Sequence, residues 1–146
     1  MIINESNIYS YNFPPIALAL RDSIVKTGRM SSALVKGFVK KRVICETIIY
    51  PTAYWRDIYI SERYKLVAKR ASMYKDKLYF IPDFLCPTIF DKDCNGRDFQ
   101  IQPLCEIKPK TETLDIKQKF KKLAPNLDCN GGNVGFLNGI ATLIDW

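Results

Sequence analysis

The chain has 146 residues, of which 47% are hydrophobic and 25% are charged, so it can form one domain with its own core but not two. Its 22 basic and 15 acidic residues give a formal net charge of +7. This charge favours a polyanionic partner, nucleic acid before an anionic membrane, over a merely basic soluble protein. The sequence contains no histidine, which excludes Ser-His-Asp and Cys-His catalysis and any nuclease that uses histidine as its base or metal ligand.

The cysteines indicate neither a disulfide framework nor a zinc ribbon, because their number, five, is odd and no two form a CxxC pair. The longest apolar run, Ile16–Leu20, is too short to span a bilayer. Asn4 and Glu5 occupy the place where a secretory signal would carry its basic region. We therefore expect a soluble, cytoplasmic protein with reduced thiols and no membrane partner.

The first predicted helix begins at Pro14-Pro15, because proline is tolerated in the first turn, where its missing N–H is not needed. Ile16, Leu20 and Ile24 follow at four-residue spacing and form an apolar stripe. Gly28 is a suitable residue to end the helix. We expect this helix to cover one face of a sheet.

The segment Met30–Arg42 can begin a second helix, capped by Ser31 or Ser32. It ends in a compact basic patch formed by Lys40, Lys41 and Arg42. This patch is either a solvated surface or a set of contacts to DNA phosphates.

Four further segments are predicted as strands from their β-branched and aromatic residues. They are Val43–Tyr50, Tyr54–Ile60, Leu78–Leu85 and Phe99–Lys108. A helix is an alternative for the first two. The last two lie on either side of a turn-rich segment, so we expect them to pair as a long hairpin.

The turn-rich segment Asp91–Asp98 opens like a calcium-binding loop, with Asp91, Asp93, Asn95 and Gly96 at suitable positions. The closing position, however, holds Gln102 in place of the bidentate glutamate. Asn-Gly is also a strong turn signal between strands. The segment is therefore predicted as a hairpin tip.

A basic helix is predicted over Leu114–Ala124, with Thr111 or Thr113 as its cap. Its apolar stripe is formed by Ile116, Phe120 and Leu123. Its remaining faces are rich in lysine, and Lys108 and Lys110 precede it. These lysines are either solvated charge or a surface that follows a DNA backbone, for which the candidates are Lys110, Lys117, Lys121 and Lys122. The final segment, Val134–Trp146, is apolar enough for a strand or helix packed on the core.

Two carboxylates and a lysine fall on the strands predicted to pair. Asp83 ends one strand, and Glu106 and Lys108 lie two residues apart on the other, which places both on one face. Carboxylates can hold Mg²⁺ (or Mn²⁺) with waters and a substrate phosphate, and an ammonium can orient the attacking water and offset charge in the transition state. Ile107 is expected to face the core and could offer its main-chain carbonyl to the metal.

Pro82-Asp83 followed by Glu106-Ile107-Lys108 resembles the PD-(D/E)xK signature of restriction-endonuclease-like nucleases. The wider strings FIPDFL and CEIKPK are most similar to transposon end-cutting subunits, and to phage head-completion and junction-resolving nucleases. The resemblance implies a single nuclease domain over residues 1–146, of the α/β class, with a mixed central sheet flanked by helices.

The same resemblance implies a Mg²⁺-dependent DNA endonuclease of a bacterium or a phage-infected cell. Asp83 and Glu106 would be metal ligands, with the Ile107 carbonyl, and Lys108 the catalytic lysine. Related enzymes act as homodimers or with a recombinase or transposase partner. They often carry a further acid upstream, for which Glu46 is the first candidate, and Glu62 and Asp22 are the others. The alternatives are a non-catalytic nucleic-acid-binding protein and a virion-assembly protein.

Overall fold

The structure is a computed structural model that describes residues 2–3, 11–45, 54–70, 84–123 and 134–144. These residues form an α/β arrangement of one six-stranded sheet, one two-stranded sheet and three helices. In chain order the elements are β1 (Ile2–Ile3), α1 (Pro15–Thr27), α2 (Ser32–Val35), β2 (Val39–Cys45), β3 (Tyr54–Ser61), β4 (Leu66–Arg70), β5 (Ile89–Lys92), β6 (Asp98–Pro103), α3 (Lys110–Leu123), β7 (Val134–Leu137) and β8 (Ile140–Leu143).

Helix α1 confirms the prediction made from its prolines and its apolar spacing. Pro15 occupies the first turn, and Leu20 and Ile24 are fully buried. The helix ends at Gly28, which adopts a left-handed conformation (φ 67°) and donates its N–H to the carbonyl of Ile24. Glycine takes this conformation without the steric cost that a Cβ brings.

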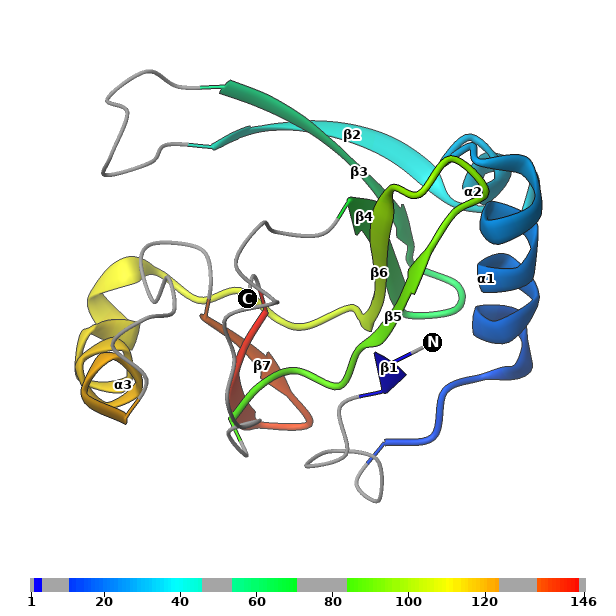
Figure 1. The fold of residues 1–146 in the computed structure, drawn as a ribbon. Coiled ribbons are helices and arrows are strands. Elements are labelled where there is room, and N and C mark those ends of the chain that lie inside the picture. The colour runs from blue at the N-terminus through cyan, green and yellow to red at the C-terminus, as the bar shows by residue number, and fades with distance from the viewer. Residues whose placement is uncertain (1, 4–10, 46–53, 71–83, 124–133, 145–146) are drawn as a thin grey trace.

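The six strands of the main sheet lie in the order β1-β5-β6-β4-β3-β2. Every pairing between them is antiparallel, where the resemblance implied a mixed sheet. Short turns join β3 to β4 and β5 to β6, and such connections can only produce antiparallel neighbours. Figure 1 shows α1 and α2 beside one face of this sheet, while α3 and the β7–β8 hairpin lie toward the other.

Strand β2 begins earlier than predicted. It starts at Val39 instead of Val43, so the basic patch Lys40–Arg42 lies inside a strand and pairs with β3. The shift follows from the register, in which Val39 pairs with Ile60 at the far end of β3. Residues 46–50 of the predicted strand lie outside the described residues.

The hairpin tip predicted at Asn95-Gly96 is confirmed, but one of its strands was wrongly assigned. Strand β5 (Ile89–Lys92) pairs with β6, instead of the predicted Leu78–Leu85. Leu85 forms a parallel bridge to Leu143 of β8. The hairpin is therefore compact, because its strands lie directly beside the turn.

The segment predicted as one strand, Phe99–Lys108, leaves the sheet after Pro103, where β6 ends. Proline cannot donate a hydrogen bond to a ladder, so strands commonly end or bulge there. The basic helix then begins at Lys110, one residue before the first expected cap, and Thr113 is buried in its first turn. Of the expected stripe, Phe120 is buried but Leu123 is exposed.

Two clusters of buried side chains hold these layers together. The larger joins α1 to the sheet through residues such as Leu20, Phe99 and Ile101. The smaller joins α3 to β7 and β8, where Phe120 stacks on Phe84 with ring centroids 4.3 Å apart. No helix in the described ranges is long and apolar enough to cross a membrane.

Candidate functional site

Glu106 lies just beyond the main sheet, where β7 holds its backbone. Its N–H donates to the carbonyl of Phe136 (2.9 Å), and the N–H of Phe136 donates to the carbonyl of Glu106 (2.8 Å). The two residues are direct antiparallel partners, so their side chains leave the same face. The carboxylate of Glu106 is exposed on that face.

Lys108 places its ammonium over the ring of Phe136, with Nζ 4.3 Å from the ring centroid. Phe136 is also the cross-strand partner of Glu106. The side chains of Phe136 and Glu106 therefore leave the same face, and the ammonium of Lys108 packs against Phe136 on that face. A cation over an aromatic face is attracted by the negative potential of the ring. The ring of Phe136 therefore holds Lys108 near the bridge to Glu106, although Lys108 is not among the residues that line the pocket described below.

The expectation that Ile107 faces the core is wrong, since its side chain is 55% exposed. The backbone has already left the sheet at this point, so its side chains no longer alternate between a covered and an open face. The expectation about its carbonyl remains a prediction.

A pocket of about 630 Å³ opens beside Glu106. Its wall also carries Glu62 and Lys65, which come from the turn between β3 and β4 and form an ion pair of 3.2 Å. Tyr11, Cys105, Phe136 and Asn138 are among the other lining residues. The structure therefore brings Glu106 to the same pocket as Glu62, one of the upstream acids considered from the sequence.

The remaining candidate acids are placed elsewhere or not described. Asp22 lies on α1, where its carboxylate pairs with Arg21 at 2.8 Å. Asp83 and Glu46 fall outside the described residues. Within the part of the chain that is described, no group of three or more His, Cys, Asp or Glu side chains could hold a metal ion. Two carboxylates with waters and a substrate phosphate nevertheless form an oxygen ligand set of the kind that Mg²⁺ takes.

Cys105, which lines the pocket, forms a thiol pair with Cys86 that the sequence did not indicate. Sγ of Cys105 lies 3.8 Å from Sγ of Cys86, which is fully buried. The hydrogen bond between the thiols, together with burial, raises the pKa of Cys86 well above its usual range, while the same bond lowers the pKa of Cys105. Cys105 is thus the thiol that forms a thiolate more readily, and it borders the pocket.

The basic residues predicted to contact DNA occupy two separate surfaces. Lys40 and Arg42 project to the side of β2 where both pair with Asp57, at 3.5 and 3.2 Å. Lys41 alternates to the opposite face. On α3, Lys117 is half-buried, Lys121 and Lys122 are exposed, and the side chain of Lys110 is not among those described. These positions do not test whether the residues contact DNA, so the predicted DNA contacts stay a prediction.

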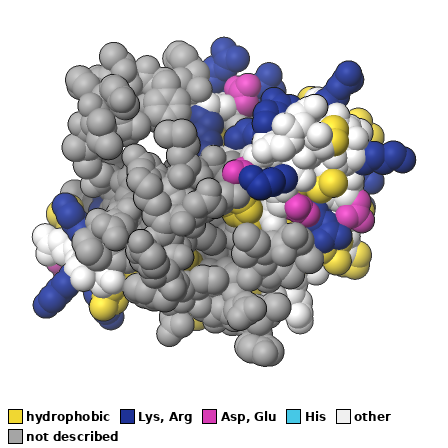
Figure 2. All heavy atoms as spheres, in the orientation of Figure 1, with side chains coloured by type: hydrophobic (Ala, Val, Ile, Leu, Met, Phe, Trp, Pro, Cys, Tyr) yellow, Lys and Arg dark blue, Asp and Glu magenta, His cyan; other side chains and the backbone are white. Residues whose placement is uncertain are grey.

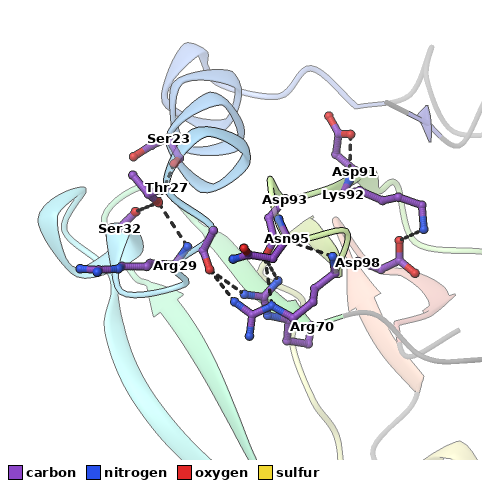
Figure 3. A network of polar contacts seen from close by, with 12 residues as sticks. Ser23, Thr27, Arg29, Ser32, Arg70, Asp91, Lys92, Asp93, Asn95 and Asp98 are labelled. Atoms are coloured by element: carbon purple, nitrogen blue, oxygen red, sulfur yellow. Dashed lines mark hydrogen bonds and ion pairs between the residues drawn. The ribbon is translucent and has the colours of Figure 1, made fainter.

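The calcium alternative for the β5–β6 turn is disfavoured by the contacts of Asp93. Its carboxylate is buried and accepts hydrogen bonds from the amides of Asn95 (2.8 Å) and Arg97 (3.0 Å). It also pairs with Arg70 at 2.8 Å (Figure 3). Protein cations and amides therefore occupy the oxygens that a calcium ion would need.

Comparisons with known proteins find no relative of the chain. No protein-family model, no curated protein and no solved structure matches it. The physical arrangement of the two acids, the lysines and the pocket is therefore the basis for a functional proposal.

Proposed function

We propose that this chain is a metal-dependent endonuclease that hydrolyses DNA phosphodiester bonds at the pocket lined by Glu106 and Glu62. The observation that carries the proposal is the convergence of these two carboxylates on one pocket from distant parts of the chain. In this proposal Glu62 serves as the further upstream acid that PD-(D/E)xK nucleases often carry, in place of the first candidate, Glu46. We include a restriction-endonuclease-like fold in this proposal. The described strands of its main sheet would then all be antiparallel.

The two carboxylates would provide oxygen ligands to Mg²⁺ or Mn²⁺, and Asp83 would add a third from outside the described residues. The bound metal would polarise the phosphate and lower the pKa of the attacking water. Glu106 is well suited to this role because its backbone is fixed by two hydrogen bonds to β7 while its side chain is exposed. A ligand held by a rigid backbone needs little reorganisation when substrate binds.

Lys108 would orient the attacking water and offset the charge that develops on the phosphate. Its ammonium is held by the ring of Phe136 on the face from which Glu106 projects. Lys65 places an ammonium on the pocket wall itself, and Lys108 would approach the pocket from beside Phe136. Preorganised cations at the place where charge develops stabilise a transition state more than they stabilise the ground state.

The test is cleavage of plasmid, single-stranded and branched DNA by the purified chain with Mg²⁺, Mn²⁺ or EDTA. Metal-dependent products are expected from the parent, and Glu106→Gln, Glu62→Gln and Lys108→Gln should reduce cleavage by about 100-fold or more. Glu112→Gln is the matched control, because Glu112 is an exposed acid on α3 that does not line the pocket. Cleavage by Glu106→Gln at the parental rate would refute the site assignment.

A non-catalytic nucleic-acid-binding protein is the second candidate, and the Glu62–Lys65 ion pair favours it. At 3.2 Å the ammonium already offsets the charge of a carboxylate that a metal would need. Such a protein would bind DNA with a strong salt dependence, yet release no product with Mg²⁺ or Mn²⁺. Absence of both DNA binding and metal binding would instead favour the virion-assembly alternative.

A further inference from the structure

A second pocket, of about 440 Å³, lies at the C-terminal end of α1 and is surrounded by arginines. Arg29 follows the helix, Arg56 and Arg70 come from β3 and β4, and Arg97 comes from the turn before β6. Gly28, Met30, Asp57 and Tyr59 complete the lining. It shares no lining residue with the pocket beside Glu106. We call it the arginine pocket.

Two of the arginines are held in place by contacts behind the pocket. Arg70 and Arg97 both pair with the buried carboxylate of Asp93, at 2.8 and 3.4 Å. Both also donate to the carbonyl of Gly28, at 3.4 and 2.6 Å. Figure 3 shows Arg70 and Asp93 meeting below the end of α1. These guanidinium groups are therefore already oriented before any ligand arrives.

Among the described residues around the arginine pocket, the cations outnumber the carboxylates. Asp93 is fully engaged, because it accepts hydrogen bonds from two amides besides its two arginine partners. Asp57 is offset by Lys40 and Arg42. Within the described part of the chain, the pocket wall therefore carries four arginines and one carboxylate, that of Asp57; one of the four, Arg56, also donates to the carbonyl of Arg70. In Figure 2, Lys and Arg side chains lie at the top and on the side of α1 and α2, with some Asp and Glu among them, and others lie on the side of α3.

The chemistry of the pocket indicates the class of ligand. A guanidinium carries five N–H donors in a planar fork that matches two oxygens of a phosphate, and it stays charged at every physiological pH. The contacts of Arg70 and Arg97 engage one nitrogen for each partner. A volume of about 440 Å³ also lies within the range of small-ligand sites.

We propose that the arginine pocket binds a backbone phosphate of a nucleic acid, away from the site where hydrolysis is proposed. The inference rests on the proposed function for its nucleic-acid ligand, and it names where that substrate is anchored. Lys40 and Arg42 extend the positive surface from the pocket along β2, which suits a chain of successive phosphates better than a single anion.

The first experiment measures binding of a fluorescent DNA oligonucleotide by anisotropy in EDTA at several salt concentrations. The Arg29→Gln/Arg56→Gln variant should bind about tenfold more weakly, with a salt slope smaller by about two. Arg21→Gln/Arg63→Gln is the control, because it removes the same charge from residues that do not line the pocket. Arg29→Gln alone is included because Arg29 is exposed, so its loss should not impair folding.

Equal affinities for the arginine-pocket variant and the charge-matched control would overturn the proposal. Because the assay contains EDTA, it is independent of catalysis. A chain that binds through these arginines but never cuts DNA would refute hydrolysis and leave the phosphate site standing. If the parent cuts DNA but the arginine-pocket variants bind DNA as tightly as the parent does, the phosphate site would be refuted and hydrolysis would stand.

The second experiment identifies the source of the phosphate by following the Nε–H signals of the arginines in NMR spectra. The oligonucleotide should shift the Arg29 and Arg56 signals at concentrations where inorganic phosphate does not. Equal shifts with inorganic phosphate would contradict a nucleic-acid ligand, and no shift with either probe would contradict the site.

Discussion

Arg70 of β4 and Asp93 of the β5–β6 turn form an ion pair of 2.8 Å whose carboxylate is completely buried. The pair lies at the end of α1: Arg70 donates to the carbonyl of Gly28, and Cys94, the residue after Asp93, donates its N–H to the carbonyl of Val25. One carboxylate therefore ties together a helix, a strand and a turn. The same interaction fixes one wall of the arginine pocket.

Replacing this carboxylate should destabilise the fold. Asp93→Ala removes the acceptor of two backbone amides and two guanidinium groups, and we expect the free energy of unfolding to fall by about 2 to 3 kcal/mol. Urea denaturation followed by circular dichroism measures this. Asp115→Ala is the control, because Asp115 is exposed on α3 and should change the stability little. Equal stability of the two variants would show that the network contributes nothing.

The contribution of Asp93 should also depend on pH. Burial alone would raise the pKa of its carboxyl, but hydrogen bonds from the amide of Arg97, the side chain of Arg70 and the amide of Asn95 outweigh burial and lower that pKa. A carboxyl with a lowered pKa in the folded state stabilises the fold at pH values above its unfolded pKa. This stabilisation is lost as the pH falls through the folded pKa. The difference in unfolding free energy between the parent and Asp93→Asn should therefore be constant near neutral pH and shrink in acid, below about pH 4. A difference that grows in acid would contradict the assignment.

The thiol pair beside Glu106 gives a prediction about reactivity. The pKa of Cys105 is lowered by its hydrogen bond with Cys86, and that of Cys86 is raised. Because the thiolate is the reactive form, iodoacetamide should alkylate Cys105 well before Cys86. The two cysteines lie in different tryptic peptides, so mass spectrometry distinguishes them. In Cys86→Ser the thiol donor is replaced by a hydroxyl at a different distance, and the alkylation rate of Cys105 should change. An unchanged rate in this variant, or faster labelling of Cys86 in the parent, would refute the pairing.

The elements that the sequence predicted well are those with local signals. Helix α1 is marked by Pro15 in its first turn and by Gly28 at its end, and both act within a few residues. The turn at Asn95-Gly96 is also local, since its conformation depends on Gly96 with φ 75°. Another such turn, Asn138-Gly139, splits the predicted final segment into β7 and β8, and its Asn-Gly signal could have been recognised in the same way.

The pairings that the sequence did not predict depend on contacts between distant residues. β6 pairs with β5 and not with the segment ending at Leu85, and Leu85 instead forms a bridge to Leu143 of β8, a partner 58 residues away in the sequence. Glu62 reaches the pocket of Glu106 only because the β3–β4 turn lies beside the end of β6, where the N–H of Leu104 donates to the carbonyl of Lys65. The arginine pocket was missed for the same reason, as its members come from four separated segments.

Gly28 permits a last prediction, because two separate effects restrict its replacement. Its φ of 67° strains any residue with a Cβ, and a Cβ there would lie 2.3 Å from Nδ2 of Asn95 and 3.0 Å from Sγ of Cys94. Gly139 has a similar φ of 80° but no atom within 4 Å of its Cβ position. Gly139→Ala should therefore show the conformational cost alone, about 1 to 2 kcal/mol in unfolding free energy.

Gly28→Ala should lose slightly more stability than Gly139→Ala, because the new methyl group also forces the side chain of Asn95 to move away from α1. The strained backbone at position 28 would also shift its carbonyl, which accepts hydrogen bonds from Arg70 and Arg97, and so weaken DNA binding in EDTA, whereas Gly139→Ala should bind like the parent. Chemical denaturation and anisotropy measure the two effects on the same samples. Equal losses of stability in the two variants, with unchanged DNA affinity, would show that close packing of the turn against α1 does not shape the arginine pocket.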